Sequence, residues 1–226
     1  MREKLYLFFK RLFDILFSLI AIVLLPLPWL IIAIVIKIQS PGPVMYRARR
    51  IGRDGKIFIL YKFRTMRVDS GNVHITTLRT DERIFPFGRF LRKSKLDETL
   101  QFINILKGDM SIIGPRPEDE GNASELYIGE YSKILSVKPG LSSPASLYDY
   151  THGELYSDEY QYVHNFLPIK MDVELYYIEN RSSIYDIKIT IMTAVIMICI
   201  IFGKKTFKEP YEVRLCKENK KKYTTV

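Results

Sequence analysis

The sequence LFDILFSLIAIVLLPLPWLIIAIVI, from Leu12 to Ile36, is apolar along almost its whole length. It is long enough to cross the hydrocarbon core of a bilayer. Two prolines, Pro26 and Pro28, interrupt it near the middle, and each removes a backbone N–H donor and clashes with the preceding helical turn. We therefore expect a retained membrane helix that breaks near Pro26. A signal peptide is not expected, because the segment has no small-residue cleavage site.

The charges on either side of this segment favour a re-entrant hairpin. A simple spanning helix should be basic at its cytoplasmic end only. Here Lys10 and Arg11 precede the apolar run, and Lys37 and Arg47 follow it closely, so both ends are expected at the cytoplasmic face. A kinked spanning anchor is the alternative, because proline is tolerated in membrane helices. Asp14, one turn after Lys10, is expected to form an interfacial ion pair.

The composition narrows the class of protein. The chain has 226 residues, enough for one domain with appendages, and a formal net charge of +9. Anionic partners are therefore expected, whether nucleic acid, a membrane surface or phosphorylated small molecules. Cys199 and Cys216 lie in an apolar run and a polar tail, and the three histidines show no ligand spacing with them. Neither a disulfide framework nor a zinc site is expected.

The remaining sequence predicts an α+β fold. Two β-prone runs flank Asp54-Gly55, a dipeptide typical of tight hairpin turns, so we expect a β-hairpin there. Several amphipathic or interfacial helices follow. A second apolar segment, Ile187 to Phe202, is short for a span and either crosses the membrane or lies on it.

One stretch, KSKLDETLQFINILKGDMSIIGPRP from Lys93 to Pro117, has two interpretations. In the first, Ser94 caps a helix with Asp97 at its third position, and the helix ends near Gly108. In the second, the stretch binds phosphate, because free N–H groups at a helix start already favour anions. Basic side chains crowd that helix start: Arg89, Arg92, Lys93 and Lys95.

The second interpretation gives each charged residue a chemical role. Basic surroundings should lower the pKa of Asp97, leaving an ionised carboxylate that can act as a nucleophile or a metal ligand. Glu98 could share a divalent ion or take a proton. Arg116, fixed between two prolines, could make a bidentate contact to phosphate. The spacing alone does not decide between a capped helix and a phosphate site.

The chain resembles the monotopic polyprenyl-phosphate phosphoglycosyl transferases, bacterial sugar transferases that start glycan assembly on a lipid carrier. The resemblance extends from about Lys10 to about Ile201 and depends on the order of its motifs, since a lone Asp-Glu pair is not specific. The motifs are KRLFDILFSLIAIVLL with the proline break, SPGPVMYRARRIGRDGKIFILYKFRTM, DERIFPFGRFLRKSKLDETLQFINILKGDMSIIGPRP, KPGL and DVELYYIENRSSIYDIKI.

The resemblance implies transfer of a sugar-1-phosphate from a UDP-sugar to undecaprenyl phosphate, with release of UMP and a requirement for Mg²⁺. The family's Asp-Glu pair falls on Asp97 and Glu98, which are then the expected catalytic and metal-binding residues. Asp97 would attack the β-phosphate to form a covalent phosphosugar intermediate. Glu98 would assist with metal binding or activate the lipid phosphate. Arg92, Arg116 and Lys62 are expected at the substrate phosphates.

The chain departs from the family pattern after its Pro-Gly motif. Many relatives continue with Thr-Gly-Trp-Ala-Gln and then an arginine, whereas this chain has KPGLSSPASLYDYTHGE and no arginine until Arg181. Lys138 is a candidate for the missing positive charge, and the identity of the sugar stays open. Three other arginines are expected at the lipid surface: Arg47, Arg49 and Arg64.

The resemblance also predicts the organisation of the chain. We expect a membrane segment over residues 1–40, a catalytic domain over 41–203 and a basic mobile tail over 204–226. This would be the family's minimal catalytic form, at the cytoplasmic face of the bacterial inner membrane, in contact with membrane lipids and compatible with a homodimer. The alternative is a non-catalytic membrane-anchored protein that binds anionic lipids or acidic partners. Nucleic-acid binding is not expected, because no recognised module is present.

Overall fold

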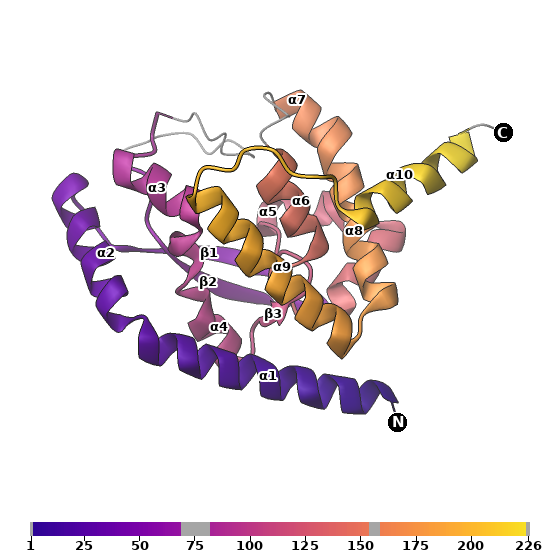
Figure 1. Ribbon diagram of the computed structural model, residues 1–226, viewed down its shortest axis with the longest axis horizontal. Coiled ribbons are helices and arrows are strands. Elements are labelled where there is room, and N and C mark those ends of the chain that lie inside the picture. Colours follow the sequence, from indigo (N-terminus) through magenta and orange to yellow (C-terminus); the bar gives the residue numbers. More distant parts are fainter. Residues whose placement is uncertain (1, 69–81, 154–158, 225–226) are drawn as a thin grey trace.

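The computed structural model describes residues 2–68, 82–153 and 159–224, and it has the α+β architecture predicted from the sequence. Within these residues, helices surround two small sheets of two strands each (Figure 1). The helices and strands are α1 (Arg2–Leu24), α2 (Pro26–Gln39), β1 (Met45–Ile51), β2 (Ile57–Phe63), α3 (Pro86–Ser94), α4 (Gln101–Lys107), β3 (Ser111–Ile113), α5 (Glu120–Leu126), β4 (Gly140–Ser142), α6 (Pro144–His152), α7 (Glu159–Gln161), α8 (Leu167–Asn180), α9 (Ser183–Ile201) and α10 (Tyr211–Thr224).

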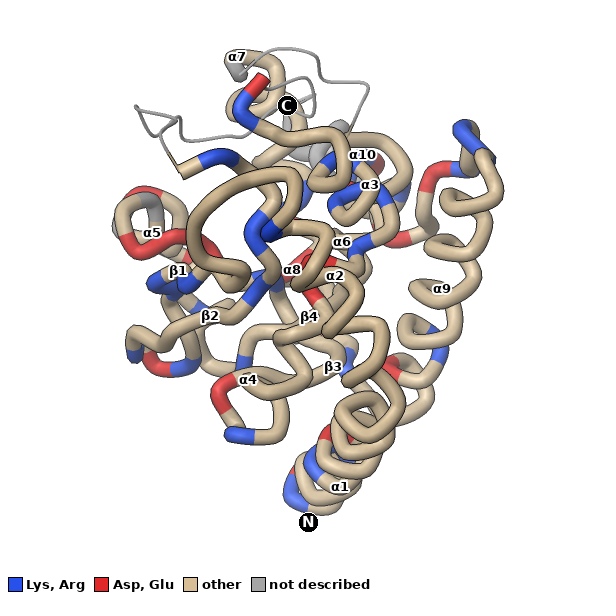
Figure 2. Tube along the Cα trace, turned by 90° about the vertical axis from the view of Figure 1, so that its left-hand side faces the viewer, with Lys and Arg blue, Asp and Glu red and all other residues tan. Residues whose placement is uncertain are grey.

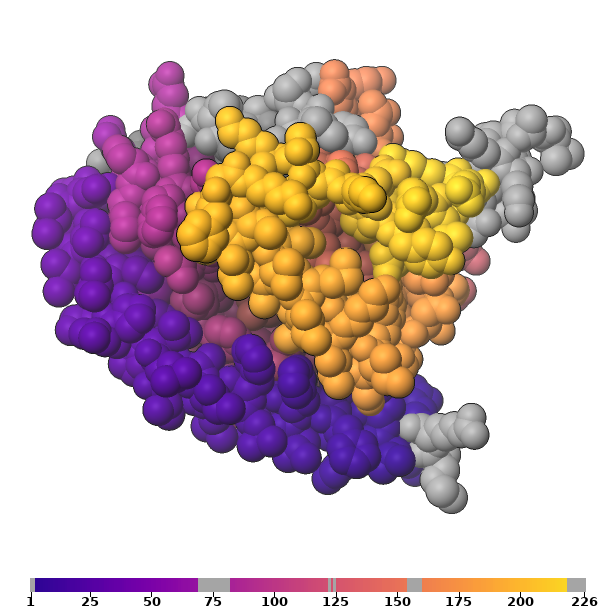
Figure 3. Space-filling view, in the orientation of Figure 1, coloured from indigo at the N-terminus to yellow at the C-terminus, as the bar shows by residue number. Residues whose placement is uncertain are grey.

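The apolar N-terminal segment breaks where the prolines predict. α1 ends at Leu24, α2 begins at Pro26, and the two helices are bent by 60°. Pro26 lies in the first turn of α2, where a missing N–H breaks no intrahelical bond. Figure 3 shows the two helices as one curved band along the edge of the molecule.

Polar side chains of α1 fasten it to the rest of the fold. The Lys10 ammonium lies 2.7 Å from a carboxylate oxygen of Asp186 in α9. The Arg11 guanidinium donates to the carbonyls of the last turn of α4. Asp14 accepts from the backbone N–H of Ile112 at 2.8 Å. The predicted interfacial ion pair of Asp14 is therefore wrong, because β3 supplies its hydrogen bonds and Lys10 pairs elsewhere.

The predicted β-hairpin is confirmed as the antiparallel pair β1 and β2. Its turn contains Asp54 and Gly55, both with positive φ (58° and 74°), which is the backbone that this dipeptide accepts readily. The fully buried Asn104 of α4 joins the edge of β2: its amide accepts from the N–H of Tyr61 and donates to the carbonyl of Ile59. α4 is thereby fixed against the hairpin.

Two glycines allow the chain to cross itself beside β3 and β4, which pair in parallel. The N–H of Gly140 donates to the carbonyl of Pro115, and the N–H of Gly114 donates to the carbonyl of Ser142. A Cβ added at Gly140 would lie 2.1 Å from the backbone nitrogen of Gly114, a distance that no side chain can adopt. This crossing fixes the position of the segment that carries Arg116.

The turn between α3 and α4 corrects the predicted capping box. The Ser94 hydroxyl donates to the carbonyls of Phe90 and Leu91 in its own helix, so it does not cap the next one. Lys95 then adopts a left-handed conformation, and Leu96–Glu98 form a single 3₁₀ turn. The predicted helix end is confirmed at Gly108, whose φ is 91°.

The C-terminal helices cover one side of the domain. α9 is long and apolar enough to cross a membrane, and in the described part of the chain the bent α1–α2 pair is the second candidate if it counts as one span. One side of α9 packs against the core through Ile189, and the opposite side is apolar and exposed. Where the sequence predicts a mobile tail, the structure has α10, whose Val213 is fully buried.

Gly140→Ala should destabilise the fold severely, because an added Cβ collides with the Gly114 backbone. We expect a loss of more than about 4 kcal/mol in unfolding free energy, seen as a fall in Tm or as failure to accumulate. Gly121→Ala is the matched control, since its Cβ would have no contact closer than 3.9 Å. A Gly140→Ala variant with native Tm would contradict the crossing described here.

Candidate active site

Two adjacent carboxylates lie at the centre of the site turn, which we define as residues 95–99. Asp97 and Glu98 expose only 4% and 6% of their surface. The turn is short and follows a left-handed residue, so neither carboxylate reaches a helix N-terminus as a cap. Figure 2 shows an acidic stretch inside the fold, beside α2, with basic positions near it.

Helix α2 covers this turn. Ile36 of α2 packs in the same apolar cluster as Leu100, immediately after the turn. The indole N–H of Trp29 donates to the Thr99 hydroxyl at 3.0 Å. At the end of α2, the buried Arg64 donates to the backbone carbonyl and the hydroxyl of Ser40. The site turn is therefore held directly against the helix that follows the proline break.

Glu98 is paired with Arg116, which comes from a distant part of the sequence. The two terminal guanidinium nitrogens of Arg116 lie 3.0 and 2.5 Å from the two carboxylate oxygens of Glu98, a bidentate geometry. Burial opposes ionisation of Glu98, but Arg116 and then Lys95 hold its pKa well below the usual range. Glu98 is therefore an ionised carboxylate in a fixed position.

The environment of Asp97 shifts its pKa in the opposite direction. Burial, and then the charge of Glu98, raise the pKa of Asp97 above its ordinary value, although Lys95 and Lys62 act against them. The predicted lowering of this pKa is wrong, because the turn is buried and not solvated at a helix start. The Oδ1 atom of Asp97 is buried and has no hydrogen-bond partner among the described residues.

Two of the predicted phosphate-binding cations lie around this pair. Lys62 projects from β2; burial lowers its pKa to about 8, against the attraction of Asp97 and Glu98. Arg92 lowers the pKa of Asp97 and donates from Nε to the Thr65 hydroxyl at 2.8 Å. The structure thus brings both cations to the pair, together with Arg116.

The other predicted basic residues lie elsewhere. Burial, followed by the charge of Arg11, lowers the pKa of Lys138, and neither Asp97 nor Glu98 is among the main charges that act on it. Arg49 pairs with Glu120 at 2.6 Å. Arg64 is only 5% exposed, so its predicted role as a lipid-surface contact is wrong. Its guanidinium serves the junction between α2 and the hairpin.

The residues of the turn fit Mg²⁺. The described residues contain no group of three or more His, Cys, Asp or Glu that could hold a metal ion. Mg²⁺, however, is commonly bound by one or two carboxylates, with water and substrate phosphates completing its shell. The carboxylate of Asp97, whose Oδ1 has no partner among the described residues, is a suitable ligand group. Both oxygens of Glu98 already accept from Arg116, so Glu98 would contribute through remaining lone pairs.

A second layer of the site was not predicted from the sequence. The buried Glu174 of α8 accepts from the backbone N–H of Arg116 at 3.1 Å and from the Ser143 hydroxyl at 2.8 Å. Burial raises the pKa of Glu174 to about 7. The ring of Tyr150, in α6, lies 4.3 Å from the Lys95 ammonium. No local pattern marks these contacts, because each joins segments far apart in the sequence.

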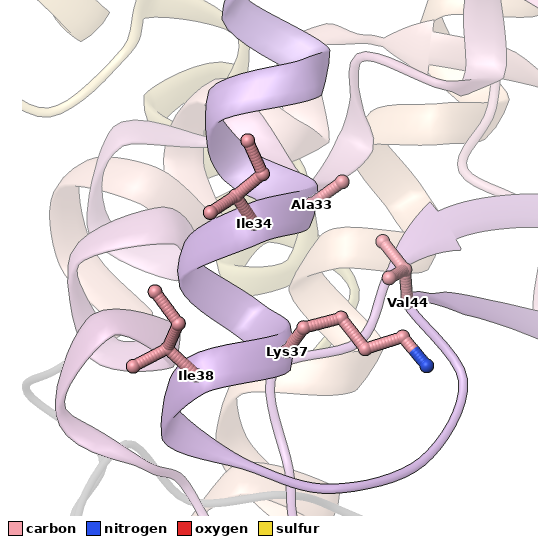
Figure 4. A pocket seen from close by; sticks show the side chains of 5 residues that line it. All are labelled: Ala33, Ile34, Lys37, Ile38 and Val44. Atoms are coloured by element: carbon pink, nitrogen blue, oxygen red, sulfur yellow. The ribbon is translucent and has the colours of Figure 1, made fainter.

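A shallow groove of about 360 Å³ lies along α2, away from the carboxylate pair (Figure 4). Ala33, Ile34 and Ile38 make most of its wall, Val44 closes one side, and Lys37 is its one charged residue. Such a surface suits contact with lipid tails and carries no group for phosphate chemistry.

The chain is similar to a family of known proteins. A family model described as "Bacterial sugar transferase" matches residues 5–199. The chain is 37% identical over 209 residues to the UDP-glucose:undecaprenyl-phosphate glucose-1-phosphate transferase of Xanthomonas campestris pv. campestris, covering 91% of this chain and 41% of that protein.

Two further relatives carry different names. The UDP-N-acetylgalactosamine-undecaprenyl-phosphate N-acetylgalactosaminephosphotransferase of Aeromonas hydrophila is 38% identical over 194 residues, covering 84% of this chain and 44% of the relative. The exopolysaccharide production protein PSS of Rhizobium leguminosarum bv. phaseoli is 37% identical over 145 residues, covering 61% of this chain and 72% of the relative. The chain spans less than half the length of the first two relatives.

Glu174 should make stability depend on pH. Its folded pKa of about 7 lies above the ordinary value of 4.5, so the folded state binds the extra proton between these values. Stability should therefore fall as pH rises from 5 to 8, by on the order of 2–3 kcal/mol. Glu174→Gln should lose this part of the pH dependence of Tm. Parallel Tm curves for the native chain and the variant would contradict the assignment.

Proposed function

The chain belongs to the bacterial sugar transferase family, and from this premise we propose that it transfers a sugar-1-phosphate from a UDP-sugar to undecaprenyl phosphate. The products are undecaprenyl-diphosphate-sugar and UMP, and the reaction is the first membrane step in the assembly of a glycan. The observation that carries the proposal is the buried, unpartnered oxygen of Asp97, surrounded by cations and held against the membrane segment.

In the first step, Oδ1 of Asp97 attacks the β-phosphorus of the UDP-sugar. The bond between this phosphorus and the bridging oxygen breaks, and UMP leaves with the electron pair. The sugar phosphate is then joined to Asp97 as an acyl phosphate. The contact geometry supports this role, because Oδ1 has no hydrogen bond to give up before it attacks.

In the second step, an oxygen of undecaprenyl phosphate attacks the same phosphorus. The acyl phosphate bond breaks, the Asp97 carboxylate is restored, and the sugar diphosphate remains on the lipid. Glu98 is already ionised and engaged by Arg116, which suits a fixed carboxylate that orients its neighbours and helps bind a metal ion. The same arginine can neutralise phosphate charge at its exposed edge.

Mg²⁺ would neutralise charge on the substrate phosphates when bound, and Asp97 and Glu98 are the residues proposed to hold it. Arg92, Arg116 and Lys62 are proposed to bind the phosphates themselves. Phosphoryl transfer depends mainly on positioning and charge stabilisation, so these groups and a carboxylate nucleophile suffice for it. The identity of the sugar is left open, since the names of the relatives include both glucose and N-acetylgalactosamine transferases.

The membrane arrangement is part of the proposal. α1 and α2 form a re-entrant hairpin whose two ends lie at the cytoplasmic face of the inner membrane, and the exposed apolar side of α9 lies in the same interface. The 60° bend, the basic residues at both ends and the packing of α2 on the site turn support it. An acceptor phosphate at the membrane surface would then be close to Asp97.

The purified native chain should release UMP from at least one member of a panel of UDP-sugars. Multiple turnovers should require both Mg²⁺ and undecaprenyl phosphate. Asp97→Asn should lower this rate by about 10³-fold or more, because the variant lacks the nucleophilic carboxylate. Asp54→Asn is the matched control. It makes the same change at an exposed hairpin turn where asparagine also accepts a positive φ.

Undiminished release from Asp97→Asn would contradict the covalent step. No release by the native chain with any donor would favour the alternative, a membrane-anchored protein without catalytic activity that binds anionic lipids or acidic partners.

The proposed re-entrant hairpin of α1 and α2 is tested by labelling single cysteines in spheroplasts, after Cys199 and Cys216 are replaced by serine. Cysteines at the exposed positions Lys4 and Lys56 should both resist a membrane-impermeant maleimide until the membrane is permeabilised. A spanning helix would place these positions on opposite sides. Labelling of the Lys4 position in intact spheroplasts would therefore contradict the re-entrant arrangement.

A further inference from the structure

Lys95, two residues before Asp97, has an unusual backbone conformation for a lysine. Its φ and ψ are 59° and 16°, in the left-handed region. Among the described residues, Asp54 in the hairpin turn is the other non-glycine residue with positive φ. This conformation ends α3, since the Lys95 N–H donates to the carbonyl of Arg92, but a position of this kind usually carries glycine or asparagine.

The surroundings direct the Lys95 side chain onto an aromatic face. Its ammonium lies 4.3 Å from the centre of the Tyr150 ring, within the range of a cation–π contact. Tyr150 is 7% exposed, and burial, followed by the charge of Glu98, raises the pKa of its phenol. The ring is therefore a rigid, neutral platform that α6 places beside the pair.

The Lys95 ammonium makes an ion pair with Glu98 but no hydrogen bond to it. Both carboxylate oxygens of Glu98 already accept from Arg116. The Lys95 ammonium lies 3.8 Å from the nearer oxygen, beyond hydrogen-bond distance. The side chain of Lys95 is 26% exposed, against 7% for Glu98, so Lys95 is the more accessible member of this ion pair.

The charges around the pair exceed what the protein itself requires. Asp97 and Glu98 carry at most two negative charges. Four cationic side chains act on one or both of them: Lys62, Arg92, Lys95 and Arg116. A diphosphate is the ligand that such a surplus would balance, and Lys95 has donor hydrogens that no residue in the described chain accepts at hydrogen-bond distance.

We propose that the Lys95 ammonium binds an oxygen of the donor's diphosphate and that Tyr150 is a positioning residue that holds it there. This inference rests on the proposed function and adds a substrate contact to it. During the first step, Lys95 would stabilise negative charge as UMP leaves. The pairing of Glu98 with Arg116 does not account for the contact between the Lys95 ammonium and the Tyr150 ring.

The test measures binding of UDP, with Mg²⁺, to the full chain in nanodiscs by calorimetry. Lys95→Asn removes the charge but keeps a residue that accepts the left-handed conformation. It should weaken UDP binding at least about tenfold, since a charge-assisted contact of about 1.5 kcal/mol or more is lost. Lys95→Arg should restore most of the affinity. Lys93→Asn, the same change at an exposed lysine two residues away, should bind as the native chain does.

Two readouts separate substrate binding from a structural role. Lys95→Asn should keep or raise the native Tm, because it relieves strain, and its UDP affinity should depend less steeply on salt. Tyr150→Phe keeps the ring face and should bind UDP within about threefold of the native chain. Tyr150→Leu, which removes that face, should weaken binding several-fold.

The inference would be overturned if Lys95→Asn bound UDP with the affinity of the native chain. It would also be overturned if the variant lost affinity together with a large fall in Tm, since the loss would then reflect a structural role. Either result leaves the proposed function standing if the native chain still releases UMP. A native chain that neither binds UDP nor releases UMP would overturn both.

Discussion

Burying two adjacent carboxylates in one turn is the constraint on which the rest of the site depends. Glu98 can stay ionised there only because Arg116 meets it with two hydrogen bonds. The arginine in turn needs a fixed backbone, which the Gly114–Gly140 crossing and the Glu174 carboxylate provide. Arg116 balances the negative charge of Glu98. Asp97 is then the carboxylate of the pair with an oxygen that has no hydrogen-bond partner among the described residues. The pair thus divides into Glu98, fixed by Arg116, and Asp97, which we propose as the nucleophile.

The same turn connects the proposed active site to the apolar N-terminal helices. α2 packs its buried side on the site turn and leaves its other side apolar and open. α1 is fastened to the domain by Lys10, Arg11 and Asp14, so the bend between the two helices is tied to the position of the Asp97–Glu98 pair. Under the proposed membrane arrangement, the fold itself would set the depth at which a lipid-bound acceptor meets Asp97.

Local sequence patterns predicted the parts of the fold that local physics determines. The proline break, the hairpin around Asp54-Gly55 and the helix end at Gly108 were all predictable, because each depends on the backbone preferences of neighbouring residues. The Ser94 cap and the lowered pKa of Asp97 were wrong, because the turn is buried by distant segments. Glu174 and the ring beneath Lys95 could not be found, since only tertiary packing brings α6 and α8 to the site.

The central claim is that Asp97 carries the sugar phosphate between donor and acceptor. It is tested most directly by mass spectrometry of the native chain mixed with Mg²⁺ and an active UDP-sugar, without lipid. We predict an added sugar phosphate on the peptide that contains Asp97, which disappears when undecaprenyl phosphate is added. UMP release at the native rate in the presence of lipid, without any such adduct or with the adduct on another residue, would contradict the account.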